Sequence, residues 1–198
     1  MRCAIPILFL VVLFATSMEA VTLPTFAIIP SGGTVSGNSG GVVGWGYDVT
    51  DNDPADWVVL NDSYVSGSLA AGTYGTYMDY IVSEFIVIDS NTDPIFSTGD
   101  VPFDAGTTSG TGEFDIAAFV PPDTKITGDV NIDYDVFSQD PNSPSFDPSS
   151  FVTSGTVSAA AEVDVNTVPE PASMLLGGAG SLMLALAAWR RRNRLALT

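Results

Sequence analysis

The chain has 198 residues with 23 acidic and 6 basic side chains, which gives a formal net charge of −17 at pH 7. It contains no histidine and one cysteine, so Ser-His-Asp hydrolases, Cys-His proteases and histidine-bound zinc sites are excluded. The length favours a single domain, and the charge opposes binding to nucleic acid or to an anionic membrane surface.

Residues 1–20 have the pattern of a secretory signal peptide. Arg2 precedes an apolar run over residues 4–15, and small residues follow that run. A cut after Ser17 fits the preference for small residues, and the exact cut site stays open. Because Cys3 lies inside this segment and before its apolar run, a lipoprotein signal is disfavoured and the exported part has no disulfide.

The body, residues 21–167, carries 21 acidic residues and one basic residue, Lys125. Three of its segments, residues 41–50, 128–137 and 151–165, alternate apolar and polar side chains, as half-buried strands do. We expect their apolar faces to form the core, with Val43, Trp45, Tyr47, Val49, Val130, Ile132, Tyr134, Val136, Val157, Ala159, Ala161, Val163 and Val165.

Shorter strands are predicted at residues 25–29, 56–60, 84–89 and 112–119, and residues 77–83 are ambiguous. Stretches rich in Gly, Ser, Asp, Asn and Pro separate these segments and predict turns. Seven or more strands without a helical period predict an all-β fold, an antiparallel β-sandwich or jelly-roll-like body.

The motif Tyr-Asp-Val-x-x-x-Asp-Pro occurs twice, at residues 47–54 and 134–141. Each copy follows an alternating segment. Duplication of a half-domain would produce such a repeat, but the flanking residues do not match. We therefore expect two strand ends that use the same turn, in which the aspartate caps backbone N–H groups and the proline ends the strand.

Carboxylates are the main candidates for chemistry in the body. One set crowds a predicted loop and another shares a predicted strand face: Asp48, Asp51, Asp53 and Asp56, then Asp129, Asp133 and Asp135. Such oxygen ligands suit Ca²⁺, the one cofactor that the sequence leaves open, although no complete EF-hand loop is present. The alternative is a solvated acidic surface, and nothing singles out a carboxylate pair for glycoside hydrolysis.

Aromatic side chains in or near loops could stack on sugar rings. Trp57, Tyr64, Tyr74 and Tyr77 have this position, whereas Trp45 and Tyr47 lie on an apolar strand face and are expected in the core. A calcium-assisted carbohydrate-binding module is thus an alternative function for the body. Ordinary packing of these rings is the competing interpretation.

The C-terminal segment, residues 168–194, has three parts. Pro169, Glu170 and Pro171 keep the chain extended. Residues 172–189 carry no charge, and as a helix they would be about 27 Å long, enough to cross a bilayer core. Basic residues follow at once: Arg190, Arg191, Arg192 and Arg194. By the positive-inside rule they stay cytoplasmic, which leaves the body outside the inner membrane.

This three-part order resembles the PEP-CTERM sorting signal of Gram-negative bacteria. The resemblance covers about 30 residues. It implies that an exosortase, an integral-membrane enzyme, recognises Pro169, Glu170 and Pro171 and cleaves near them. It also implies export, a membrane-anchored intermediate and delivery to the cell surface or extracellular matrix. A permanent C-terminal anchor is the alternative. The sequence and this resemblance therefore predict a non-catalytic surface or matrix protein whose partners are exosortase and, transiently through residues 172–189, the inner membrane. For the alternative carbohydrate-binding function, the resemblance implies that the partner is the exopolysaccharide that such bacteria make.

Overall fold

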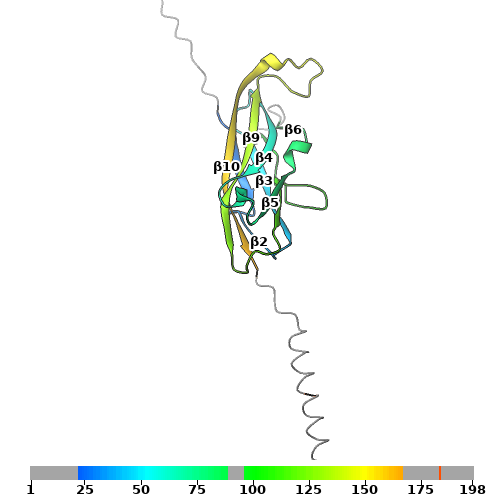
Figure 1. Cartoon of the computed structure of the whole chain (residues 1–198). Coiled ribbons are helices and arrows are strands. Elements are labelled where there is room, and N and C mark those ends of the chain that lie inside the picture. Colours follow the sequence, from blue (N-terminus) through cyan, green and yellow to red (C-terminus); the bar gives the residue numbers. More distant parts are fainter. Residues whose placement is uncertain (1–21, 89–95, 167–182, 184–198) are drawn as a thin grey trace, which may run out of the picture.

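The computed structural model describes residues 22–88 and 96–166, together with Met183. Two five-stranded β-sheets make up the body (Figure 1). In the first sheet the order is β1 (Thr25–Ile29), β3 (Val42–Asp51), β8 (Gly112–Ile116) and β5 (Gly75–Asp79), and β7 (Phe96–Ser97) also pairs with β3. In the second the order is β2 (Thr34–Gly37), β10 (Phe151–Val165), β9 (Lys125–Phe137), β4 (Trp57–Val65) and β6 (Ile86–Ile88).

The three long alternating segments form strands β3, β9 and β10, as predicted. β9 and β10 pair antiparallel over almost their whole length, and β4 pairs antiparallel with the other side of β9. Helical structure within residues 22–88 and 96–166 is limited to three short 3₁₀ turns: η1 (Leu69–Ala71), η2 (Ile81–Ser83) and η3 (Pro148–Ser150). The prediction of an all-β body with two sheets is therefore confirmed.

One strand pair departs from the antiparallel prediction. β2 runs parallel to the end of β10, with Thr34 opposite Glu162 and Gly37 opposite Val165. After β1, which belongs to the first sheet, the chain turns at residues 30–33 and enters the second sheet. Gly33 permits this turn because its φ is +68° and a Cβ there would lie 2.0 Å from the Ala160 carbonyl oxygen.

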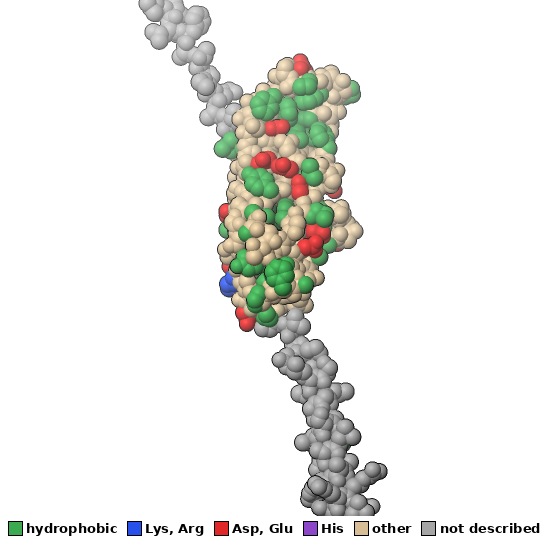
Figure 2. All heavy atoms as spheres, viewed as in Figure 1, with side chains coloured by type: hydrophobic (Ala, Val, Ile, Leu, Met, Phe, Trp, Pro, Cys, Tyr) green, Lys and Arg blue, Asp and Glu red, His purple; other side chains and the backbone are tan. Residues whose placement is uncertain are grey.

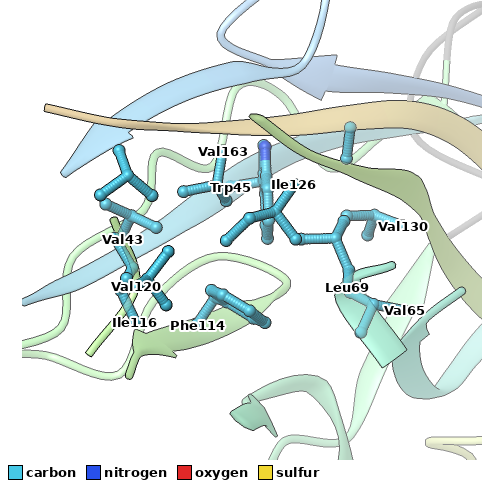
Figure 3. Packing of buried hydrophobic residues seen from close by; sticks show 12 residues of the cluster. Val43, Trp45, Val65, Leu69, Phe114, Ile116, Val120, Ile126, Val130 and Val163 are labelled. Carbon is cyan, nitrogen blue, oxygen red and sulfur yellow. The ribbon is translucent and has the colours of Figure 1, made fainter. Parts of the chain in front are cut away.

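The core fills the space between the two sheets and has two clusters. The first surrounds Trp45 and is drawn in Figure 3; the second surrounds Tyr47 and Val49. Trp45 is fully buried, and its indole Nε1 donates a hydrogen bond of 2.7 Å to the Gly33 carbonyl oxygen. The inward rows predicted for β3 and β9 are confirmed, whereas Val157 and Ala159 of β10 are only partly buried.

A polar contact joins the two sheets beside this core. The Ser63 hydroxyl oxygen lies 2.5 Å from Asp79 Oδ1, 2.5 Å from the Thr111 carbonyl oxygen and 2.9 Å from the Tyr77 hydroxyl. Ser63 belongs to β4, whereas Asp79 and Tyr77 belong to β5 in the other sheet. The buried Ser63 hydroxyl is therefore hydrogen-bonded, as buried polar groups between two apolar sheets usually are.

Candidate functional site

The loop after β3 uses its aspartates mainly to hold its own backbone. Asp51 Oδ1 accepts a 2.9 Å hydrogen bond from the Asp53 N–H, and Asp53 Oδ1 accepts one of 3.1 Å from the Ala55 N–H. Asp48 accepts a hydrogen bond from the Ser97 hydroxyl on β7. The predicted turn is confirmed in the second copy of the motif as well, where the Asn142 N–H donates to Asp140 Oδ1 at 2.8 Å.

Asp51 is the unusual member of this loop. Its side chain closes the inward row of β3 and is only 3% exposed, and its Oδ2 is buried without a hydrogen-bond partner among the described residues. Burial, with a smaller contribution from the charges of Asp53 and Asp56, raises the pKa of Asp51 to about 6. Burial, followed by the charge of Asp53, also raises the pKa of Asp56.

Replacing Asp51 with asparagine is expected to stabilise the protein at pH 8. The pKa of Asp51 is 3.8 in an unfolded chain and about 6 in the fold, so the folded state binds the proton more tightly. Stability therefore falls as the pH rises from about 4 to 6, and the loss is complete above that range. Asparagine keeps the acceptor for the Asp53 N–H and removes this loss, a gain of about 3 kcal/mol at pH 8.

Urea denaturation of wild type and Asp51→Asn at pH 4 and pH 8 measures this effect. The two proteins should have nearly equal stability at pH 4 and differ at pH 8. Asp100→Asn is a suitable control, because Asp100 is exposed and is not among the charges that raise the pKa of Asp51, so it should leave the pH dependence of the wild type in place. A lower stability of Asp51→Asn at pH 8 would show that the buried carboxylate is ionised and bound to a partner.

The second acidic set lies on the outer face of the second sheet. Asp133 is opposite Asp62 of β4 and accepts a hydrogen bond from the Thr156 hydroxyl of β10. Burial, together with the charges of Asp133 and Asp79, raises the pKa of Asp62. Asp129 instead accepts a 3.0 Å hydrogen bond from the Ser66 hydroxyl.

These two sets do not form a metal centre in the part of the chain that the structure describes. No group of three or more acidic side chains there is arranged to hold a metal ion. The reason is physical: the loop aspartates point at backbone N–H groups, and the strand-face aspartates are spread along β9. Figure 2 shows acidic side chains dispersed between neutral and apolar ones on one face of the body.

The aromatic residues are brought together only in part. Tyr64, which is 43% exposed, and Tyr77 line an open groove with Leu69, Ala70 and Thr76. Tyr74 packs against the first core cluster. Trp57 lies at the start of β4, paired with Phe137 of β9, and does not line this groove. A continuous platform of the four rings is therefore not formed.

The residues of the predicted sorting signal lie outside the described part of the chain. This applies to Pro169, Glu170, Pro171, Arg190, Arg191, Arg192 and Arg194, and to the predicted membrane-spanning segment except Met183. The signal peptide predicted at residues 1–20 lies outside it too. Among the residues that are described, no helix has the length and apolarity needed to cross a membrane.

Among solved structures, the chain is similar to the CooA pilin subunit from enterotoxigenic Escherichia coli, with 12% identity and a TM-score of 0.32 over 73% of this chain and 100% of that one. It is also similar to the sixth cohesin of scaffoldin B from Acetivibrio cellulolyticus, with 15% identity and a TM-score of 0.28 over 73% and 100% of the two chains. The seventh ScaB type I cohesin from Pseudobacteroides cellulosolvens has 10% identity and a TM-score of 0.27 over 74% and 95%. These similarities are too distant to carry an argument.

A comparison with curated proteins finds no match. A family model does match the end of the chain: residues 167–192 fit the model of the PEP-CTERM protein-sorting motif. The match includes the two prolines, the glutamate and three of the four arginines that the sequence singles out. The chain is therefore a protein that carries a PEP-CTERM protein-sorting motif.

Proposed function

We propose that the protein is an exported, non-catalytic component of the cell surface or extracellular matrix, sorted by an exosortase through its C-terminal motif. The observation that carries this proposal is the match of residues 167–192 to the PEP-CTERM motif. It is joined by the signal-peptide pattern of residues 1–20 at the other end of the same chain. Export and membrane processing need both segments, which agrees with their placement on either side of the body.

Each part of the motif has a physical task in this proposal. The uncharged segment 172–189 holds the protein in the inner membrane as a transient intermediate. Arg190, Arg191 and Arg192, with Arg194, stay on the cytoplasmic side and fix the orientation. Pro169 and Pro171 cannot continue a helix, so Glu170 is offered to the enzyme on an extended segment outside the membrane.

The body, residues 21–167, is then the part delivered. It carries 21 acidic residues and one basic residue, which repels nucleic acid and keeps a secreted protein soluble. Two packed sheets without disulfides form the body, and strand pairing and turn contacts hold its backbone. We assign it a structural or display role at the surface.

Replacing Pro169, Glu170 and Pro171 together with alanine is expected to abolish sorting. Alanine lets the membrane helix extend into the segment that the enzyme must bind, and it removes the only charge there. The full-length variant should accumulate in the inner membrane, and surface material should fall at least about tenfold, a factor worth ~1.4 kcal/mol of recognition. Cell fractionation with an antibody against the body measures both pools.

The matched control replaces Pro121 and Pro122, an exposed proline pair in the body, with alanine. This variant should be sorted as the wild type is. Unchanged surface delivery of the triple variant would refute the proposed role of the motif. If neither variant reached the cell surface, the result would instead indicate a general failure of export or folding.

A further inference from the structure

Most of β10 has one unpaired side. Residues 151–164 pair with β9 on one side, but on the other side β2 covers only Glu162 to Val165. Within residues 22–88 and 96–166, no strand pairs with the other side of residues 151–161. This side stays unpaired because β1 enters the first sheet before β2 joins the second: β1 lies near β10 but pairs with β3. In Figure 1, β10 runs along one margin of the body.

The backbone groups that point to the open side can be identified from the paired end of the strand. The Glu162 N–H donates to the Gly33 carbonyl at 3.0 Å, and the Asn166 N–H donates to the Gly37 carbonyl at 2.7 Å. Backbone groups alternate sides along a strand, so even-numbered residues face away from β9. The N–H and C=O groups of Ser154, Thr156 and Ser158 therefore face the open side.

This edge lacks the features that usually prevent strands from pairing. From Phe151 to Ala161 there is no charged residue and no proline, in a body with 21 acidic residues. The bulge near Val152 and the Gly33 turn limit the open stretch at its two ends. The acidic residues at the covered end, Glu162 and Asp164, are both ion-paired with Lys125, at 2.5 and 3.0 Å.

We propose that the open edge of β10 binds the same edge of a second copy of this protein. The two copies of β10 would run antiparallel about a two-fold axis at Thr156, so that Thr156 faces its own copy and Ser154 faces Ser158 of the partner subunit. In this register the inward-pointing N–H and C=O groups of each copy meet those of the other. The hydroxyl side chains of Ser154, Thr156 and Ser158 then lie opposite hydroxyl side chains of the second copy, on the solvent-exposed face of the second sheet. Such Thr and Ser pairs across neighbouring strands are favourable.

The charge of the body selects this edge for self-association. Two copies with a strongly negative surface can meet only where neither presents acidic side chains. In the joined sheet, three strand spacings separate the acidic face of one β9 from that of the other, about 14 Å. This exceeds the Debye length of about 8 Å at physiological salt, so the repulsion between the two rows is screened.

Cysteine cross-linking of the full chain in detergent tests both the contact and its register. The only cysteine, Cys3, is first replaced with serine. In this background Thr156→Cys places two thiols opposite each other across the axis, whereas Ser158→Cys places them about four residues apart, or ~13 Å. Under mild oxidation, Thr156→Cys should form a covalent dimer at least tenfold faster than Ser158→Cys.

Sedimentation of the same protein without new cysteines gives a second measurement. Thr156→Pro removes an N–H that faces the open side and not β9, so it should preserve the fold and weaken dimerisation at least about tenfold. Thr156→Val keeps the N–H and loses only the hydroxyl, so it should dimerise more tightly than Thr156→Pro. The proposal is overturned if the wild type is monomeric at 100 µM, as it would be if another segment of the chain covered the edge. Equal cross-linking of the two cysteine variants would also overturn it.

Discussion

Replacing Trp45 with alanine is expected to remove about 3–5 kcal/mol from the free energy of unfolding, a large part of the 5–15 kcal/mol typical of a domain. Trp45 has no exposed surface and lies at the centre of the first core cluster, between residues of both sheets (Figure 3). Its neighbours belong to rigid strands, so they cannot collapse fully into the cavity. Urea denaturation followed by far-UV circular dichroism measures the loss.

A second substitution at this position and a control at an exposed ring separate the contributions. Trp45→Phe keeps much of the buried area but loses the bond to the Gly33 carbonyl, which still accepts the Glu162 N–H at 3.0 Å. Its cost should therefore be smaller, about 1–2 kcal/mol. Phe119→Ala, at a ring that is 74% exposed, should be nearly neutral. Similar midpoints for Trp45→Ala and Phe119→Ala would contradict the assignment of Trp45 to the centre of the core.

Replacing Gly46 with alanine is expected to cost about 2–3 kcal/mol, because the added methyl group overpacks a backbone contact. A Cβ at Gly46 would lie 2.3 Å from the Val101 carbonyl oxygen and 2.9 Å from Pro102 Cα. The segment that it would displace is fixed beside β3 by two 2.9 Å hydrogen bonds between Tyr47 and Val101. The methyl group can fit only if this segment moves away from the strand.

Gly106→Ala is the control for the general effect of adding a methyl group to glycine. A Cβ there would meet only Asp104 Oδ1, at 3.2 Å, which is the end of a flexible side chain. Thermal unfolding of both variants should show a clear fall in melting temperature for Gly46→Ala and almost none for Gly106→Ala. Equal melting temperatures would mean that residues 101–103 do not pack on β3 as described.

The strands that the sequence predicts best are those with the strongest alternation. β3, β9 and β10 were expected within a few residues of their observed bounds, because their apolar rows face the core directly. β2 was missed, since residues 31–41 are rich in Gly and Ser and favour turns. Its strand conformation comes from pairing with β10 and not from local preference. β5, which overlaps the start of the ambiguous region 77–83, is likewise fixed by pairing with β8.

The candidate sites were harder to predict because spacing does not determine the direction of a side chain. The Asp-rich loop has a spacing that suits Ca²⁺, yet Asp51 and Asp53 bind N–H groups two residues further on. The Asp-Pro turns themselves were predictable, since that chemistry is local. The buried position of Asp51 was not, because the sequence does not show that the inward row of β3 continues to its last residue.

The central claim is that residues 168–194 direct sorting and are cut from the mature protein. Intact-mass spectrometry of the protein recovered from the cell surface tests it most directly, with the Pro169/Glu170/Pro171 alanine variant from the membrane fraction as reference. The surface form should end near Pro169 to Pro171 and lack the arginine cluster, whereas the variant should keep it. Surface material that still contains Arg190 to Arg194 would contradict the claim.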